Sequence, residues 1–101
     1  MTDTEGLVVV AVDDEQPALA ELTYLLGRTA GVAQVRPAST ATDALELLQA
    51  DDVDAVFLDI RMPGMDGLAL ARVIGRFAAP PPVVFVTAYD SHAVDAFDIA
   101  A

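Results

Sequence analysis

Acidic side chains follow two apolar stretches of the chain, at the point where each stretch stops. Asp13 and Asp14 come directly after residues 7–12, and Asp59 comes directly after residues 55–58. Both stretches are unbroken apolar runs, which is typical of strands buried on both faces of a parallel sheet. Open parallel sheets bind their ligands beyond the carboxyl ends of the strands. These three carboxylates are therefore candidate site residues.

Carboxylates held close together repel one another, and two like charges 4 Å apart cost about 4 kcal/mol at an effective dielectric of 20. A hard cation relieves this repulsion, and Mg²⁺ is suitable because it prefers oxygen ligands and often bridges carboxylates and a phosphate. A carboxylate beside Mg²⁺ can act as a nucleophile and form an aspartyl phosphate. The pattern predicts a magnesium and phosphoryl site at Asp13, Asp14 and Asp59. Thr87, which ends another apolar run, can donate its hydroxyl to a phosphoryl oxygen.

The elements that position these residues alternate between strands and helices. Further strands are predicted at residues 33–38, at an edge of the sheet, and at residues 83–86, as a buried strand. Four helices are predicted, each from an apolar stripe. The first carries Leu19, Leu22, Leu25 and Leu26 and is ended by Gly31, and the second carries Ala44, Leu45, Leu47 and Leu48 and is opened by a capping box at Thr40. The third carries Leu70, Val73, Ile74 and Phe77, and the fourth carries Ala93, Val94 and Phe97 and is opened by Asp90 or Ser91.

This βαβαβαβα order predicts an α/β fold, a doubly wound parallel sheet with helices on both faces. If the strand order is flavodoxin-like, 2-1-3-4, the strands that precede Asp13 and Asp59 are neighbours. The carboxylates then converge where the strand order reverses. The predicted fold therefore brings the three candidate carboxylates to one place.

Length, charge and composition exclude several classes of function. The 101 residues are one domain at most, and the longest apolar run, six residues, is too short to span a membrane. Sixteen acidic residues against five basic ones give a net charge of −11, so direct contact with nucleic acid or an anionic membrane is not expected. The absence of cysteine and of a targeting segment favours the cytoplasm.

Three motifs together resemble the receiver domain of two-component response regulators. They are V-D-D-E at residues 12–15, L-D-I-R-M-P-G-M-D-G at residues 58–67 and V-T-A at residues 86–88. The resemblance covers essentially the whole chain. The segment T-A-Y-D at residues 87–90 and the residues after it look most like receivers attached to LytTR-type DNA-binding domains.

The resemblance implies a role for each matched residue. Asp59 would be the phosphoacceptor and Thr87 the switch hydroxyl. Asp13, Asp14, Asp59 and the backbone carbonyl of Arg61 would hold Mg²⁺. The implied partners are a histidine kinase and, in the full-length protein, a C-terminal DNA-binding output domain, so the chain would be a signalling phosphoacceptor rather than an enzyme.

The chain departs from the family in one respect: it lacks the Lys whose positive charge accompanies the phosphoryl group. The family carries a Lys at the end of a fifth strand, and this chain contains no Lys. We therefore expect residues 1–101 to be a receiver domain that lacks the fifth strand and fifth helix, with impaired phosphorylation. An exposed edge at residues 83–86 would then favour a homodimer or other association through that edge.

Two alternatives to a phosphorylated receiver stay open. A binding-only receiver that is never phosphorylated would also fit the missing Lys. A magnesium-dependent phosphohydrolase would also use an aspartyl phosphate, but that class typically has Asp-x-Asp on its first strand. Here the two acids are adjacent, as Asp13-Asp14.

Overall fold

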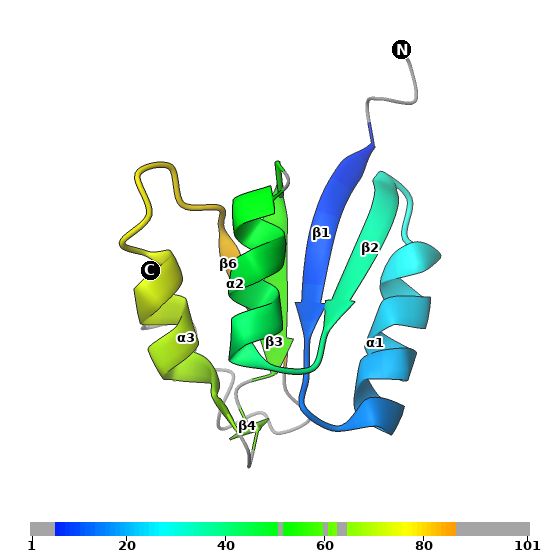
Figure 1. The fold of residues 1–101 in the computed structure, drawn as a ribbon. Helices are drawn as coiled ribbons and strands as arrows, with labels where there is room; N and C mark the ends of the chain where they lie inside the picture. The colour runs from blue at the N-terminus through cyan, green and yellow to red at the C-terminus, as the bar shows by residue number, and fades with distance from the viewer. Residues whose placement is uncertain (1–5, 51, 60, 63–64, 87–101) are drawn as a thin grey trace.

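The sheet is built around β1 (Leu7–Val12) and β3 (Ala55–Asp59), which pair in parallel. The structure is a computed structural model that describes residues 6–50, 52–59, 61–62 and 65–86. β2 (Val32–Ala38) pairs with the free side of β1, and β6 (Val83–Val86) pairs with β3, both in parallel. The order β2-β1-β3-β6 confirms the predicted flavodoxin-like order and the edge position of residues 33–38 (Figure 1).

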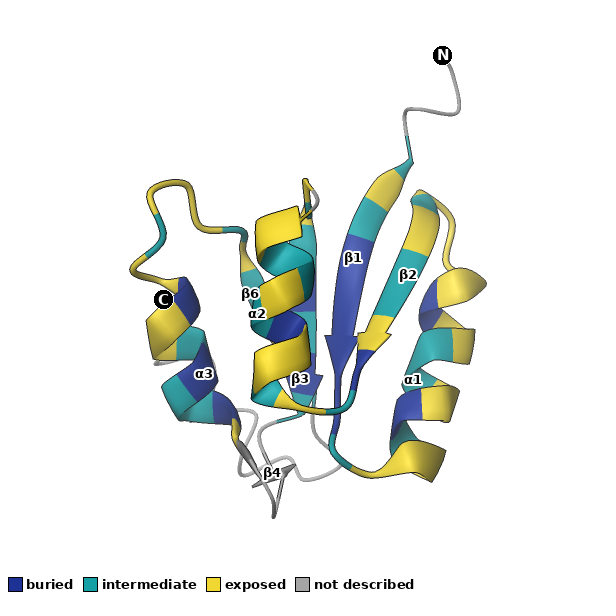
Figure 2. Cartoon of the chain, in the orientation of Figure 1, coloured by how far each residue is buried: buried dark blue, intermediate teal, exposed yellow. Residues whose placement is uncertain are grey.

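Three described helices cover the two faces of this sheet: α1 (Gln16–Gly27), α2 (Ala41–Ala50) and α3 (Gly67–Ile74). Alternate residues of β1 point to opposite faces. Val10 and Val12 join a core with α2 and α3, whereas Val9 and Ala11 join a second core with Leu19 and Leu26 of α1. The buried positions therefore lie along the carboxyl-terminal part of β1, in β3 and on the inner sides of the helices (Figure 2).

Local signals in the sequence start each helix where it was predicted. Pro17 lies in the first turn of α1, where its missing N–H needs no partner. The Thr40 hydroxyl accepts a hydrogen bond from the Asp43 backbone N–H (3.0 Å), which confirms Thr40 as the cap of α2. Asp66 caps α3 in the same way with its carboxylate.

Three predictions about the helices were wrong in detail. The third helix ends at Ile74, so Phe77, which was predicted on its apolar stripe, lies beyond it. The first helix ends at Gly27 and not at Gly31, because the Arg28 N–H closes the last turn onto the carbonyls of Tyr24 and Leu25. Gly31 instead has φ +94°, which favours glycine, and its carbonyl accepts from the Leu7 N–H (2.7 Å) where the chain turns into β2. The predicted stripe was also too wide, since the side chain of Leu25 is 53% exposed.

The segment after Asp59 contains pairing that the sequence did not predict. β4 (Arg61–Met62) and β5 (Met65–Asp66) form a two-residue antiparallel ladder in a stretch predicted to be loop. β6 is half-buried rather than buried, because within the described residues it pairs only with β3. The last helix, predicted to begin at Asp90 or Ser91, lies outside the described residues. In the described part of the chain no helix is long and apolar enough to cross a membrane.

Candidate functional site

The candidate site lies at the carboxyl edge of the sheet, where β1 and β3 end side by side. Val12 pairs with Leu58, so the residues that follow them in the chain, Asp13 just after β1 and Asp59 at the end of β3, lie at the same level of the sheet edge. The Asp13 backbone N–H donates to the carbonyl of Ala38 at the end of β2 (3.2 Å). Three neighbouring strands therefore fix the backbone of Asp13, and its side chain is only 5% exposed.

The Asp13 and Asp59 carboxylates lie within hydrogen-bonding range of each other. Burial raises the pKa of Asp13, because it removes water from the charged form. The Glu15 backbone N–H, which donates to Asp13 Oδ1 (3.0 Å), acts in the opposite direction and lowers the pKa. The contact with Asp59 and the charge of Asp14 raise it further. The net result is a pKa above 3.8, the usual value for this group.

The predicted three-carboxylate arrangement is only partly visible. Asp14 follows Asp13 and contributes electrostatic repulsion to it. However, among residues 6–86 as far as they are described, no three acidic or histidine side chains gather closely enough to form a metal site. The structure thus brings Asp13 and Asp59 together as a pair, with Asp14 adjacent in the chain.

Of the other two predicted site residues, the structure describes the backbone of Arg61 but not Thr87. The backbone of Arg61 lies in β4, paired with Asp66, two residues beyond Asp59. Val86, the last described residue, pairs with Asp59. Thr87 is the next residue in the sequence and lies outside the described residues, so the switch role predicted for it stays a prediction.

Two aspartates that were not predicted as site residues hold the elements that position the site: Asp54 at the opposite, amino end of β3, and Asp66 at the start of α3. Asp54 accepts a hydrogen bond from the Val8 N–H at its Oδ2 (2.8 Å) and donates its own N–H to the Val8 carbonyl (2.7 Å). This fixes the register of β3 against β1. Asp66 Oδ1 accepts from the N–H groups of Leu68 (3.0 Å) and Ala69 (3.1 Å). The sequence signal for Asp66 was an Asp immediately before a helical stripe; Asp54 has no local signal.

Comparisons with known proteins agree with this architecture. A family model described as "Response regulator receiver domain" matches residues 9–101. The chain is 43% identical over 95 residues to "Sensory transduction protein LytT" of Bacillus anthracis (94% of this chain, 39% of that protein). It is 42% identical over 93 residues to "Transcriptional regulatory protein YpdB" of Escherichia coli K12 (92% of this chain, 38% of that protein). The chain therefore spans less than two fifths of the length of either curated relative.

A solved structure is similar as well. The response regulator protein TrrA of Thermotoga maritima, in complex with Mg²⁺-BeF, superposes with a TM-score of 0.76 at 29% identity, over 94% of this chain and 81% of that one. The match with LytT agrees with the predicted likeness to LytTR-type receivers. Because the family model covers nearly the whole chain and the sheet order is the one predicted, the chain belongs to the response regulator receiver domain family.

Proposed function

We propose that this receiver domain takes a phosphoryl group from a histidine kinase onto Asp59. The observation that carries the proposal is the contact between Asp59 and the buried Asp13 at the ends of adjacent strands. In the transfer, an Asp59 carboxylate oxygen attacks phosphorus and the P–N bond to the kinase histidine breaks. The bonding electron pair leaves with the imidazole nitrogen. The chain itself supplies the nucleophile, and the end of β3 holds it beside Asp13.

The residues at this edge fit a magnesium ion. Every side chain that is a candidate ligand offers carboxylate oxygen, which Mg²⁺ prefers, and the raised pKa of Asp13 indicates a site where negative charge lacks compensation. Asp13, Asp14, Asp59 and the Arg61 carbonyl would hold the ion. When bound, Mg²⁺ neutralises charge on the carboxylates and the incoming phosphoryl oxygens. The Mg²⁺-BeF complex of TrrA supports this assignment by similarity.

We propose further that phosphorylation acts as a switch rather than as enzyme turnover. Thr87 would supply the hydroxyl that contacts the phosphoryl group, and the altered surface would act on an output domain in the whole protein. The name of YpdB and the short span that this chain covers of it support a DNA-binding output domain. The absence of cysteine is compatible with the cytoplasm, the compartment we propose.

A binding-only receiver is the second candidate, because among the described residues no three acidic or histidine side chains gather into a metal site. Such a receiver would bind its partners without accepting a phosphoryl group. The two candidates make opposite predictions for a single experiment.

The test is intact-mass spectrometry after incubation with Mg²⁺ and acetyl phosphate. Our proposal expects an acid-stable, base-labile adduct of about 80 Da, one phosphoryl group. The adduct should be absent in Asp59→Asn and retained in Asp54→Asn, a matched control at the other end of β3 whose amide oxygen can still accept from Val8. No adduct in the wild-type chain would contradict phosphoryl transfer and favour the binding-only receiver.

A further inference from the structure

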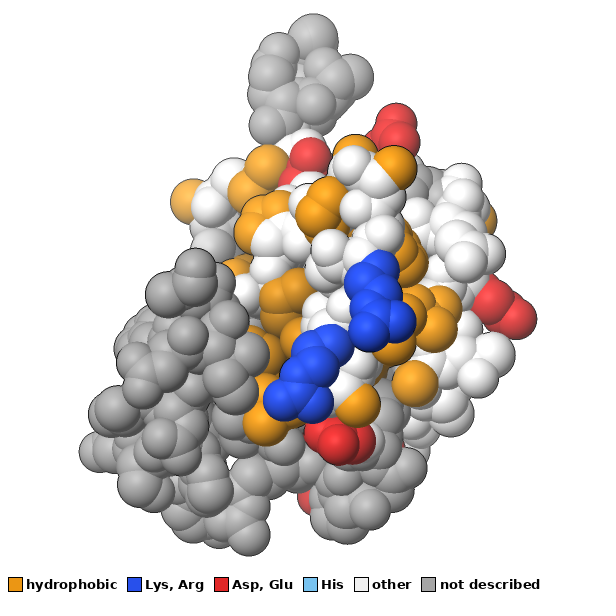
Figure 3. Space-filling model, turned by 90° about the vertical axis from the view of Figure 1, so that its left-hand side faces the viewer, with side chains coloured by type: hydrophobic (Ala, Val, Ile, Leu, Met, Phe, Trp, Pro, Cys, Tyr) orange, Lys and Arg blue, Asp and Glu red, His pale blue; other side chains and the backbone are white. Residues whose placement is uncertain are grey.

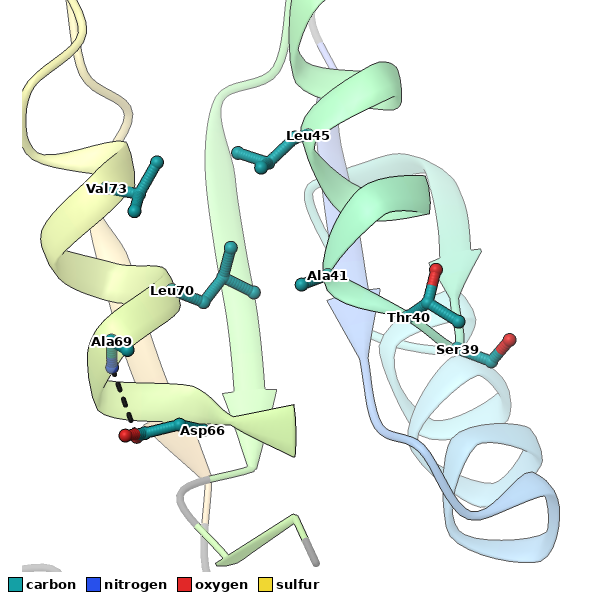
Figure 4. A pocket seen from close by; sticks show the side chains of 8 residues that line it. All are labelled: Ser39, Thr40, Ala41, Leu45, Asp66, Ala69, Leu70 and Val73. Carbon is teal, nitrogen blue, oxygen red and sulfur yellow. Dashed lines mark hydrogen bonds between the residues drawn. The ribbon is translucent and has the colours of Figure 1, made fainter. Parts of the chain in front are cut away.

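A groove lies between α2 and α3, and neither Asp13 nor Asp59 lines it. It has a volume of about 360 Å³, and we refer to it as the α2–α3 groove. Its lining is formed by Ser39, Thr40, Ala41, Leu45, Asp66, Ala69, Leu70 and Val73. Leu45 of α2 and Leu70 of α3 point toward each other between the two helices, whereas Asp66 lies at the end where α3 begins (Figure 4).

The walls of this groove are mostly apolar. α2 contributes Ala41 and Leu45, and α3 contributes Ala69, Leu70 and Val73. Leu70 is buried against the core, but Val73 is 44% exposed although it lies on the apolar stripe of its helix. A partner that covers this side chain would gain the free energy of removing apolar surface from water.

Positive charge lies beside these apolar walls. Arg72 and Arg76 are both exposed and four residues apart, at the end of α3 and just beyond it. Figure 3, which views the side of the molecule that carries α3, shows two Lys or Arg side chains next to each other among hydrophobic ones, with one acidic side chain directly below the lower of the two. The pair stands out in a chain with only five basic residues and a net charge of −11.

Acidic groups do not cancel this charge along the α2 wall of the groove, whose lining residues Ala41 and Leu45 are uncharged. Asp66 is the acidic lining residue, and its Oδ1 already accepts from two N–H groups at the start of α3. The groove therefore combines mostly apolar walls with two exposed arginines on and just after α3, and with Asp66 at the end where α3 begins.

We propose that the α2–α3 groove binds an amphipathic helix of a partner protein, with apolar side chains on one face and carboxylates beside it. A helix laid between two helices would place residues one turn apart against Leu45, which is half-buried, and Val73, which is exposed. Its carboxylates would pair with the guanidinium groups of Arg72 and Arg76. This inference does not depend on phosphorylation of Asp59.

Charge complementarity favours such a partner over a second copy of this chain. Two copies with a net charge of −11 each repel at long range, so self-association through the groove would have to overcome this repulsion, as association through β6 must. An acidic helix on a partner of lower overall charge carries the local complement without this cost. Rim charges of this kind set specificity and association rate more than total affinity.

The test uses three synthetic helical peptides of about 16 residues, long enough to form a helix on binding. They share a Leu pattern at i, i+4 and i+7 and carry Glu, Gln or Lys at the flanking positions. Binding to the 101-residue protein is measured by fluorescence anisotropy, and the site is located by amide chemical shifts. We expect the Glu peptide to bind at least about tenfold more tightly than the Lys peptide.

Variants on the two arginines locate the interaction. The double variant Arg72→Glu, Arg76→Glu should weaken the Glu peptide by about tenfold or more and strengthen the Lys peptide. Arg28→Glu, on the far side of the molecule after α1, is the matched charge control and should leave both affinities unchanged. Val73→Ser should weaken all three peptides, and circular dichroism checks that each variant is folded.

Four results would overturn the proposal. They are equal affinity for the three peptides, an equal loss in Arg28→Glu, no binding of any peptide up to about 1 mM, and binding of anionic phosphatidylglycerol vesicles without binding of peptide. Sedimentation that shows a dimer abolished by Arg72→Glu, Arg76→Glu would assign the groove to a second copy instead.

Discussion

Asp66 controls the start of α3, the helix that follows the β4–β5 ladder and forms one wall of the α2–α3 groove. Its Oδ1 accepts from the N–H groups of Leu68 (3.0 Å) and Ala69 (3.1 Å). α3 has only eight residues, and helices this short are marginal without capping and tertiary packing. We therefore expect Asp66→Ala to destabilise the protein although the side chain is exposed.

The size of the effect follows from these two contacts and the charge. Losing an N-cap acceptor costs about 1 kcal/mol, and losing a negative charge at a helix N-terminus adds about 0.5 kcal/mol. Asp66→Ala should therefore lower the free energy of unfolding by about 1.5 kcal/mol. Asp66→Asn keeps the oxygen that accepts both hydrogen bonds, so it should lose only about 0.5 kcal/mol.

Urea unfolding followed by circular dichroism measures both variants against the wild-type protein. For a domain of this size, the Asp66→Ala change corresponds to a decrease of about 6–12 °C in Tm. Thr40→Ala is the matched control, because it removes a single capping hydrogen bond from α2 and should cost about 1 kcal/mol. Amide hydrogen exchange should also accelerate first in α3 for Asp66→Ala and first in α2 for Thr40→Ala.

Two outcomes would refute this reasoning. If Asp66→Ala stays within about 0.3 kcal/mol of the wild-type protein, the cap does not stabilise α3. If Asp66→Asn is as unstable as Asp66→Ala, the charge matters and the two hydrogen bonds do not.

Three further predictions concern the site, the edge strand and the core. The folded state holds a proton on Asp13 more tightly than the unfolded chain does, because the pKa of Asp13 is raised by folding. The stabilisation that this protonation contributes is therefore fully present below pH 3.8, and it is lost as the pH rises through the folded-state pKa. Asp13→Asn should therefore raise the midpoint of urea unfolding at pH 7 but not near pH 3, and Mg²⁺ should raise the wild-type midpoint more than that of the variant; a destabilised variant at pH 7 would contradict this. Association through β6, where Val84 is 41% exposed, should appear as a concentration-dependent mass in light scattering that Val84→Lys reduces, whereas a wild-type monomer at high concentration would rule it out. Ile74→Ala, at a fully buried position of α3, should cost about 2–5 kcal/mol in urea unfolding, and a loss below about 1 kcal/mol would mean that the core closes around the missing atoms.

The longer strands could be predicted from the sequence because the burial of a strand determines which residue types it contains. β1 is covered on both faces, so Val9 to Val12 are all buried, and the run contains no polar alternation. β2 lies at the edge, and its mixture of Val with polar residues predicted this position, although its burial does not alternate residue by residue. β4 and β5 could not be predicted in this way, because a ladder of two residues on each side has no periodicity to detect.

Helix stripes and site contacts were harder to predict for a different reason. Periodicity places Leu25 and Val73 near the apolar face of a helix, but whether each is covered depends on which element packs there, and both are largely exposed. The two acids of the pair, Asp13 and Asp59, were found because each directly follows a strand. The contact of Asp54 with Val8 joins residues 46 positions apart, so no local pattern could indicate it.

The fold and the candidate site place opposite demands on the edge of the sheet where β1 ends. Burial of Asp13 beside Asp59 disfavours the charged folded state, as the raised pKa of Asp13 indicates. The structure tolerates this cost because β1 is held on both sides and its last four residues are almost completely buried. A ligand that neutralises the pair must therefore stabilise the folded protein by the same linkage. Occupancy of this site and stability of the domain are thus two measures of one equilibrium, and a change at the carboxylates must be felt along β1 and β3.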